Sequence, residues 1–590
     1  MRRLLTIFLV LVALGAALAA VGVALARRSG AVPRLLAADR VLSLDLGGEL
    51  PDYRPPSPLP WLERRAGSDL AGLWRALAAA RRDPAVRAVA VRIDDLGAGL
   101  AKAQELRRQL AATAAAGKRV DCYLDTAGEG SNGTLEYYVA SGCSSISLAP
   151  VGEINLLGLY ADPLFLRGTL DKLKLEAEFI AAGRYKSLGE TYTETAHSPA
   201  AREAIDAVLD GYWRQLVGDL AAARSLTPER IRALVDEAPL SASGALRAKL
   251  VDHVEYADEL RERLDAALGG TPEWVELDDY LRGARNPVAG RNAVAVVFAQ
   301  GTIVRGKGGV APWTSEMLIG SDGLGDLLDE LAEDDGVSAV VVRVDSGGGS
   351  AVASDLLHRR VTRLARAKPV VVSMSDLAAS GGYYLAMGAQ RIVAEPATLT
   401  GSIGVVSGKL ATGRFESELL GATRDPLARG ARAGIYATSQ PFDADERDAL
   451  EARIGEIYDR FLGVVAAGRD LPRPAVERVA QGRVWVGEDA LAHGLVDELG
   501  GLDAAVAAAR KLAGLAGDEG PLRLYPRALG FWEWFAESGP PLAQGWLPLA
   551  RAALGHDAAL LDETVALGRA ARAPGTLELP RSWRTLVRPF

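Results

Sequence analysis

Residues 375–388 read SDLAASGGYYLAMG, and residues 129–142 read EGSNGTLEYYVASG. Both segments end in Tyr-Tyr, an aliphatic residue, Ala, one variable residue and Gly. They differ just before the tyrosines, where SGG at 380–382 stands against TLE at 134–136. The chain therefore carries one apolar helix pattern twice, and of the two copies the second precedes it with a serine and two glycines.

Matching segments surround both copies at a separation of about 245–251 residues. The strand-like runs RVLSLDLGGEL (40–50) and VAVVFAQGTIV (294–304) open the two halves. After helix-like stretches come the β-branched runs DPAVRAVAVRIDD (83–95) and DGVSAVVVRVDS (335–346). Strands that alternate with amphipathic helices predict βαβ units and a mostly parallel sheet. The sequence thus predicts an α/β protein built from two related domains in tandem.

The predicted chain order is an N-terminal transmembrane anchor, two domains and a tail, at residues 1–28, 36–285, 290–515 and 516–590. The stretch GARNPVAGRN, rich in Gly, Pro and Asn, marks the boundary between the domains. The tail has no counterpart in the first half and contains Trp532, Trp534, Trp546 and Trp583. It is either an arm packed on the second domain or a contact with a membrane or another subunit, since Trp favours such boundaries.

The N-terminal run Leu4–Ala26 is apolar and uncharged, with pairs of arginines at 2–3 and 27–28. A helix of this length, at about 1.5 Å per residue, is about 35 Å long and can cross a ~30 Å hydrocarbon core. A cleaved signal peptide usually has a shorter apolar region of about 7–15 residues, although the Ala-rich end resembles a cleavage site. We therefore predict an uncleaved anchor with a short cytoplasmic tail and the bulk of the chain outside the cytoplasm.

The composition argues against several classes of function. A net charge of −8 does not suit a general nucleic-acid binder. The five histidines are scattered without HExxH or a similar ligand spacing, so no metal site is predicted. Cys122 and Cys143 lie in apolar segments, where we expect buried free thiols, with one disulfide as the alternative.

Ser380 follows a predicted strand at 369–374 after a short loop, and it precedes the helix-like run YYLAMGA. A helix N-terminus offers unpaired N–H groups and a partial positive charge, which favour a developing oxyanion. Gly381 and Gly382 would let a substrate backbone approach closely. The alternative is structural, because a serine followed by two glycines is also an ordinary helix N-cap.

A second glycine cluster, DSGGGS at 345–350, follows the strand predicted at 337–345. A glycine-rich strand end can direct a backbone N–H at a carbonyl oxygen and, with the N–H of Gly381, complete an oxyanion hole. The cluster is no phosphate loop, since GxxxxGK[ST] is absent, and no dinucleotide fingerprint, since its glycines are contiguous.

A serine nucleophile needs a base, and no histidine lies in a suggestive position. Lys186, in AAGRYKSLGE, can serve if burial lowers the pKa of its amine from about 10.4 to about 7–8. The corresponding stretch of the second half, ARGARAGIYA at 428–437, carries Arg432, which stays protonated and cannot be a base. Each half thus lacks what the other has, although a lysine taken alone is usually a surface residue.

Together these motifs resemble the bacterial signal peptide peptidase A family in its long, tandem-domain, membrane-anchored form. The resemblance covers nearly the whole chain except the tail and rests on AASGGYY (378–384), LTGSIG (399–404), the glycine turn, GRYKS (183–187) and SPAARE (198–203). It implies a ClpP/crotonase-like fold in each half. It also implies a Ser/Lys dyad with Ser380 as nucleophile and Lys186 as general base.

The resemblance further implies that Gly381 and Gly348 form the oxyanion hole and that Ser402 orients the Lys186 amine, although Ser402 reads equally well as a helix or turn cap. It implies a serine endopeptidase that needs no cofactor, degrades remnant signal peptides and other apolar peptides, and assembles as a homotetramer. Such a protein would lie in the bacterial inner membrane with its catalytic bulk on the periplasmic side.

The glycine turn departs from the N-S-P-G-G-S pattern usual in that family, because Gly347 stands for proline and Asp345 for asparagine. The glycine predicts a more flexible turn. Two other classes of function are alternatives: a catalytically degenerate membrane scaffold, and a crotonase-like acyl-CoA enzyme with a similar oxyanion hole. The joint presence of Ser380 and Lys186 argues against both, and the apolar N-terminal segment argues further against the acyl-CoA enzyme.

Overall fold

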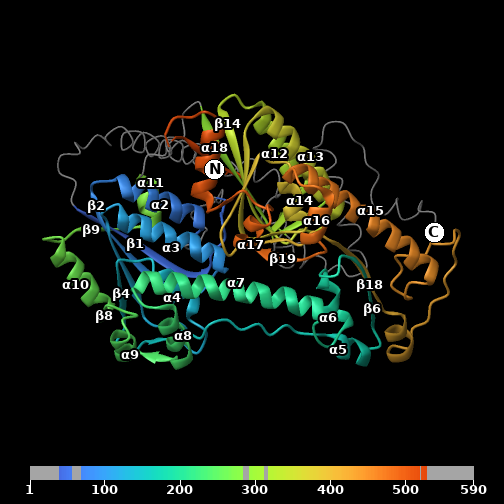
Figure 1. The fold of residues 1–590 in the computed structure, drawn as a ribbon, viewed down its shortest axis with the longest axis horizontal. Helices are drawn as coiled ribbons and strands as arrows, with labels where there is room; N and C mark the ends of the chain where they lie inside the picture. Colours follow the sequence, from blue (N-terminus) through green and yellow to red (C-terminus); the bar gives the residue numbers. More distant parts are fainter. Residues whose placement is uncertain (1–38, 56–67, 284–291, 311–316, 518–519, 528–590) are drawn as a thin grey trace, which may run out of the picture. The chain divides into compact units, whose positions relative to one another are not determined.

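A computed structural model of the chain describes residues 39–55, 68–283, 292–310, 317–517 and 520–527 (Figure 1). The predicted anchor at 1–28 and the four tail tryptophans lie outside these ranges. Within them, no helix is long and apolar enough to cross a bilayer. Of the described residues, 39–53 and those from 68 to 524 form one compact unit, and 54–55 and 525–527 belong to a second. The candidate site and the sheets described below, up to residue Leu524, belong to the first of these two units.

The first half forms the predicted parallel sheet, with strand order β8-β4-β3-β2-β1-β9. Its strands are β1 (Arg40–Glu49), β2 (Val86–Gly97), β3 (Arg119–Leu124), β4 (Ser145–Leu148), β8 (His253–Val254) and β9 (Glu273–Glu276). The accompanying helices are α2 (Leu70–Arg82), α3 (Leu100–Ala115), α4 (Thr134–Ala140), α5 (Arg167–Lys172), α6 (Glu190–Thr193), α7 (Pro199–Arg224), α8 (Pro228–Glu237), α9 (Ala242–Arg247), α10 (Ala257–Ala267) and α11 (Leu277–Gly283).

The second half forms an eight-stranded sheet with the order β19-β17-β15-β14-β10-β21, in which β16 lies beside β15 and β20 beside β16. Its strands are β10 (Ala293–Gln300), β14 (Val337–Ser346), β15 (Val370–Ala379), β16 (Arg391–Ala394), β17 (Leu399–Gly401), β19 (Val484–Val486), β20 (Glu498–Leu499) and β21 (Leu522–Tyr525). Its helices are α12 (Ser321–Glu333), α13 (Ala351–Ala367), α14 (Gly381–Ala386), α15 (Ala444–Arg469), α16 (Arg473–Val479), α17 (Gly487–Ala492) and α18 (Leu502–Leu512).

Smaller sheets complete the described fold. β11 (Thr302–Val304), β12 (Gly308–Val310) and β13 (Met317–Gly320) form one of them, and β5 (Glu153–Ile154) pairs with β7 (Leu240–Ser241). β6 (Glu176–Ala182) pairs antiparallel with β18 (Val405–Ala411). This last sheet joins the first half of the chain to the second, and the chain leaves β6 toward Lys186.

The repeat seen in the sequence is also present in side-chain contacts. Tyr137 and Tyr383 are both fully buried, and their hydroxyls donate to Leu250 O and Leu495 O, each at 2.8 Å. The tyrosine and its backbone partner thus occupy equivalent places in each half. The Tyr-Tyr pattern therefore encodes a packing helix that is common to both halves, as predicted.

Two sequence-based expectations are wrong. Cys122 and Cys143 are not free thiols but form a disulfide, because β3 brings Cys122 beside the turn that follows α4. The predicted loop between residue 374 and Ser380 is also absent, since β15 continues to Ala379. Its last three residues pair with β17, while a bulge shifts the register against β14. The serine is consequently held directly by a strand end.

Candidate active site

Ser380 lies between the end of β15 and the start of α14, in a strained backbone conformation. Its φ is 54°, a region that residues other than glycine rarely adopt. Its amide donates to Gly401 O at 2.9 Å, which ties the turn to β17. The side chain makes no cap hydrogen bond to α14. Ser380 thus occupies the N-cap position of α14 without capping it through its side chain, and its hydroxyl is directed to another partner.

That partner is Lys186, whose Nζ lies 3.0 Å from Ser380 Oγ. The same amine lies 2.9 Å from Ser402 Oγ and 3.1 Å from Ser402 O. Ser402 also has a positive φ, 51°, and follows directly after β17. The structure thus brings together three residues singled out in the sequence, two from the second half and one from the first.

The loop that carries Lys186 is anchored in the second half. Tyr185 N donates to Gln481 O at 2.8 Å. At Gly482, with φ +78°, an added Cβ would lie 2.6 Å from the backbone nitrogen of Lys186. This close approach needs a glycine. Lys186 is therefore positioned by backbone contacts between the two halves, and the expectation of a surface lysine is not met.

Burial lowers the pKa of Lys186 to about 8. The partners of its amine are two hydroxyls and a carbonyl, none of which carries a charge that would stabilise the ammonium. A sizeable fraction of the amine is consequently neutral near physiological pH. This meets the requirement for a lysine that acts as a general base.

The glycine turn lies against Ser380. Gly348 has a φ of +96°, and a Cβ there would stand 2.5 Å from the amide nitrogen of Gly381 and 3.0 Å from Ser380 Cβ. The two predicted oxyanion donors are therefore adjacent. In the structure, however, the Gly348 N–H donates to Ser346 Oγ at 3.1 Å. An oxyanion would have to take this N–H from Ser346.

The two departures in the turn have structural consequences. Gly347 does not occupy the left-handed region, and a Cβ there would meet a Leu377 methyl group at 3.3 Å. The turn is fixed on its far side because Ile303 N donates to Gly348 O at 2.8 Å and Ser350 N donates to Ile303 O at 2.9 Å. Asp345, in place of asparagine, accepts a 2.7 Å hydrogen bond from Lys102 Nζ.

Sequence reasoning missed Lys102 and Asp376. Asp376 lies four residues before the nucleophile candidate and accepts from Gly99 N and Lys102 N, both at 2.9 Å. The sequence contains one clue to this contact. The helix predicted at 100–115 carries several polar side chains, although buried strands precede and follow it. The sequence does not identify Asp376 as the partner of this helix, because Asp376 lies 274 residues after Lys102.

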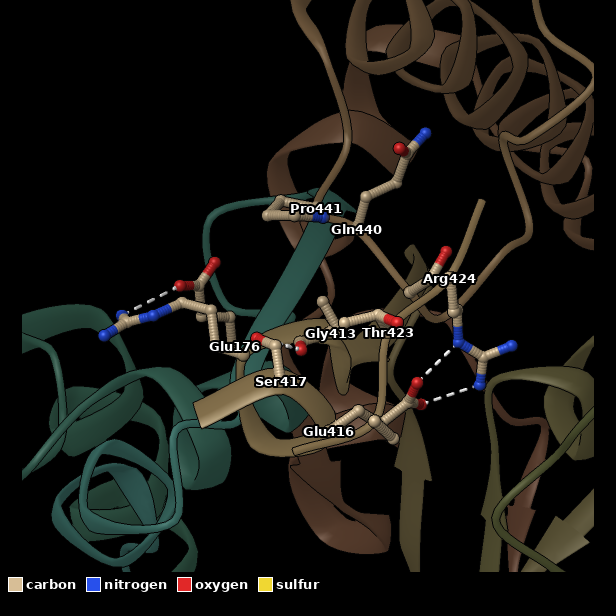
Figure 2. A pocket seen from close by; sticks show the side chains of 12 residues that line it. Glu176, Gly413, Glu416, Ser417, Thr423, Arg424, Gln440 and Pro441 are labelled. Carbon is tan, nitrogen blue, oxygen red and sulfur yellow. Dashed lines mark hydrogen bonds and ion pairs between the residues drawn. The ribbon is translucent and has the colours of Figure 1, made fainter. Parts of the chain in front are cut away.

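The pocket in Figure 2 lies apart from these residues, since none of the predicted site residues lines it. Arg424 in its wall is paired with Glu416 at 2.8 Å, and Arg414 is paired with Glu176 at 3.3 Å. Its cations are thus neutralised by neighbouring carboxylates. Within the described residues, no group of three or more His, Cys, Asp or Glu could hold a metal ion.

Comparison with known sequences places the chain in a family. The model of "Peptidase family S49" matches twice, at residues 116–269 and 362–516. The chloroplastic serine protease SPPA of Arabidopsis thaliana is 31% identical over 80% of this chain and 69% of its own length. Protease 4 of Salmonella typhi is 33% identical over 64% of this chain and 62% of its own length. Protease 4 of Haemophilus influenzae is 32% identical over 67% of this chain and 65% of its own length.

Solved structures add little to this assignment. A mutant ClpP1 of Listeria monocytogenes aligns with 35% of this chain and 91% of its own at 13% identity and a TM-score of 0.23. A mutant membrane-bound stomatin-specific protease aligns with 40% of this chain and 99% of its own, at 16% identity and a TM-score of 0.26. TM-scores this low do not establish a shared fold, so the ClpP/crotonase-like fold stays a prediction. The two family matches and the relatives show that the chain belongs to peptidase family S49 and is a serine protease.

Proposed function

We propose that the protein is a membrane-anchored serine endopeptidase that degrades remnant signal peptides and other apolar peptides by a Ser/Lys dyad. The observation that carries the proposal is the 3.0 Å separation between Lys186 Nζ and Ser380 Oγ. This distance is within hydrogen-bond reach, which a general base must achieve. The lowered pKa of the amine supplies the neutral form that proton transfer requires.

In the proposed mechanism, neutral Lys186 takes the proton of Ser380 as Oγ attacks the scissile carbonyl carbon. The oxyanion accepts from the amides of Gly381 and Gly348, the latter exchanging Ser346 Oγ for the substrate oxygen. The protonated amine then gives its proton to the leaving nitrogen, and the peptide C–N bond breaks. Ser402 holds the amine in line through its hydroxyl and carbonyl. No cofactor takes part.

The acyl-enzyme is hydrolysed by the reverse route. Water replaces the leaving amine, Lys186 takes its proton, and hydroxide adds to the ester carbonyl. Collapse of the second oxyanion returns the proton from the lysine to Ser380 Oγ and releases the carboxyl product. One lysine thus serves as base and acid in each half-reaction.

The proposed location is the bacterial inner membrane, with the catalytic bulk on the periplasmic side. The apolar run at 4–26 supports the anchor. The disulfide between Cys122 and Cys143 supports an oxidising compartment, where such bonds persist. The substrate class is supported by a relative of Enterococcus faecium named "Putative signal peptide peptidase SppA", which is 34% identical over 29% of this chain and 50% of its own length.

A homotetramer is part of the proposal, and the internal repeat supports an assembly of this kind. β6 pairs with β18 within the chain, but their repeat counterparts, 159–165 and 422–428, form no strand. Each counterpart exposes an apolar side chain, Tyr160 at 84% and Leu427 at 88%. Pairing of 159–165 in one subunit with 422–428 in the next would repeat the intrachain contact around a closed ring. Tyr160→Arg and Leu427→Arg should each yield smaller species in analytical ultracentrifugation.

The test is the activity of Ser380→Ala and Lys186→Ala in the full-length, folded protein. Each change should reduce cleavage of an apolar fluorogenic peptide by at least about 10³-fold, because dyad members act as a unit. Near-wild-type cleavage by either variant would refute the dyad. A serine-directed covalent probe distinguishes the degenerate scaffold, which should stay unlabelled, and CoA binding would indicate the acyl-CoA alternative.

A further inference from the structure

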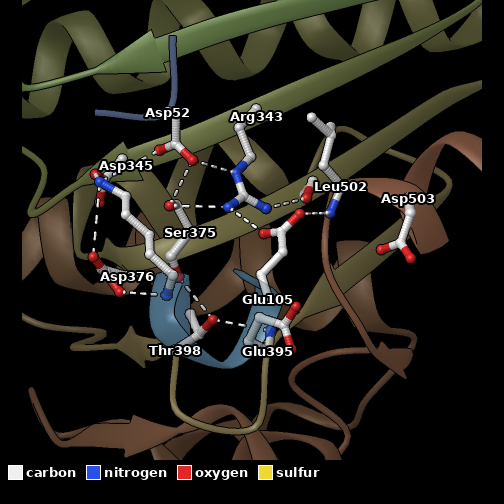
Figure 3. A network of polar contacts seen from close by, with 12 residues as sticks. Asp52, Glu105, Arg343, Asp345, Ser375, Asp376, Glu395, Thr398, Leu502 and Asp503 are labelled. Atoms are coloured by element: carbon white, nitrogen blue, oxygen red, sulfur yellow. Dashed lines mark hydrogen bonds and ion pairs between the residues drawn. The ribbon is translucent and has the colours of Figure 1, made fainter. Parts of the chain in front are cut away.

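A buried polar network joins the first half of the chain to the two loops of the candidate active site (Figure 3). On the side of the second half it includes Asp345, which precedes the glycine turn, and Asp376, which precedes Ser380. From the first half, α3 contributes Lys102, whose side chain is 8% exposed. None of these residues has a role in the dyad chemistry.

Lys102 lies between the two carboxylates. Its Nζ donates to Asp345 Oδ2 at 2.7 Å and lies 3.7 Å from Asp376 Oδ2. Asp345 Oδ1 in turn accepts from Leu377 N at 3.2 Å, which links the strand end before the glycine turn to the strand end before Ser380. One ammonium group thus bridges the segment that holds one oxyanion donor and the segment that holds the nucleophile.

The backbone at the N-terminus of α3 also contacts Asp376. Gly99 is the N-cap residue of α3 and has no side chain to cap it. Asp376 of the second half supplies the cap by accepting from Gly99 N and Lys102 N, where its negative charge suits the helix N-terminus. A Cβ at Gly99 would lie 2.5 Å from Asp376 Oδ1, so a larger residue there would displace the carboxylate.

The remainder of the network fixes α3 in place. Arg343 is fully buried and donates to Asp52 at 2.9 Å and to Glu105 of α3 at 2.7 Å. Burial acts to lower the pKa of Lys102, but the carboxylates of Asp52, Asp345 and Asp376 outweigh it and hold that pKa above its ordinary value. The bridging ammonium therefore stays charged at neutral pH, and its removal would leave the carboxylate of Asp345 without the cation that neutralises it.

We propose that Lys102 is a positioning residue for the peptidase reaction, which sets the spacing between the Gly348 turn and Ser380 by bridging Asp345 and Asp376. The proposal rests on the proposed roles of Ser380 and Gly348. In this account the first half contributes twice to catalysis, through the base Lys186 and through the N-terminus of α3. A displacement of about 1 Å between reacting groups can cost about 10²-fold in rate.

The test compares Lys102→Met with a matched control, Arg263→Met, in the full-length protein. Arg263 also pairs with two largely buried carboxylates, Asp121 at 3.0 Å and Glu255 at 2.8 Å, but all three lie in the first half and away from the site. Both variants should lower Tm. Lys102→Met should also lower kcat on an apolar fluorogenic peptide about 10–100-fold with KM within about twofold. Arg263→Met should keep kcat within about twofold.

A double variant, Lys102→Met with Asp345→Asn, keeps the proposal testable if the single variant does not fold. The asparagine side chain retains an acceptor for Leu377 N and removes the unpaired charge, so Tm should recover toward the wild type. The kcat should remain at least about fivefold low, since methionine cannot bridge the loops. A kcat that recovers together with Tm, or a Lys102→Met variant as active as Arg263→Met, would overturn the proposal.

Ser380→Ala is measured alongside these variants to separate the two proposals. An active Ser380→Ala protein would refute the dyad itself. An inactive Ser380→Ala protein, combined with unimpaired Lys102 variants, would refute the positioning role of Lys102 and leave the dyad intact.

Discussion

The segment around Thr134 and the segment around Ser380 share a packing helix but differ in how their hydroxyls are used. Thr134 Oγ1 accepts from Gly158 N at 3.1 Å, and Asn132 Nδ2 donates to Gly158 O at 2.7 Å. In the first copy, the backbone of Gly158 thus satisfies the polar groups of Thr134 and Asn132. In the second copy the hydroxyl of Ser380 meets the amine of Lys186. The two copies of the scaffold therefore differ in that one carries the proposed nucleophile and the other a hydroxyl that is bonded to its own backbone.

The neighbouring turns differ in the same way. In the first half, Glu136 is 6% exposed and accepts from Leu96 N at 3.1 Å, so a carboxylate already covers an N–H near the end of β2. The second half has Gly382 at the place of Glu136 in the repeat. The small residue leaves the amides beside Ser380 free of a built-in anion. In the first copy, hydrogen bonds within the chain thus occupy the groups that correspond to those beside Ser380 in the second copy.

Two arginines at matching positions of the repeat have different partners. Arg92 of β2 is largely exposed and binds Asp125 at 3.1 Å. Arg343, at the matching position of β14, is fully buried and binds Asp52 and Glu105 from the first half. Burial of a charge is tolerated only with such partners. The second-half site is therefore completed by the first half, and not the reverse.

Gly348→Ala should have the largest effect among changes that leave the dyad in place. The new Cβ would lie 2.5 Å from Gly381 N, at a φ of +96° that alanine rarely adopts. Because both predicted oxyanion donors would shift, kcat should fall about 10²–10³-fold. Steady-state kinetics on a peptide substrate measure this. A loss of less than about fivefold would show that the turn does not hold the oxyanion.

Ser402→Ala should have an intermediate effect. It removes the hydroxyl 2.9 Å from Lys186 Nζ and keeps the carbonyl contact at 3.1 Å. With one of two orienting contacts left, we expect about a 10-fold loss in kcat with KM little changed. Ser407→Ala, an exposed serine of β18, is the control. Equal activity of Ser402→Ala and Ser407→Ala would show that Ser402 is a structural turn residue and does not orient the lysine.

Thr134→Ala should have the smallest effect on catalysis. The change removes the acceptor of Gly158 N in the first copy, which leaves a buried amide unpaired and costs about 1–3 kcal/mol of stability. Activity at a temperature well below the transition should stay within about twofold of the wild type. A loss of activity comparable to that of Ser402→Ala would contradict the view that the first copy has no catalytic part.

The sequence predicts the site better than the contacts that support it. Ser380, Lys186 and Ser402 could be found because each lies in a short motif whose residue types suit the chemistry. The bridge from Lys102 to Asp345 and Asp376 could not, since a lysine in a helix pattern normally faces water and its partners come from the other half.

The two wrong expectations have a similar cause. The disulfide depends on how β3 and the turn after α4 meet in space, which the spacing of Cys122 and Cys143 does not reveal. The extension of β15 to Ala379 depends on pairing with β17, a strand about 20 residues further on. In both cases, contacts between segments distant in sequence override the local pattern.

The pairing of Ser380 with Lys186 can be tested by measuring, as a function of pH, the rate at which a serine-directed fluorophosphonate labels Ser380. Burial lowers the pKa of Lys186 to about 8, so the neutral base accumulates as pH rises through that value. The labelling rate of the wild type should rise tenfold per pH unit below about 8 and level off above it. In Lys186→Met the rate should fall at least about 10²-fold and lose this inflection. An unchanged inflection near 8 in Lys186→Met would contradict a base supplied by the first half.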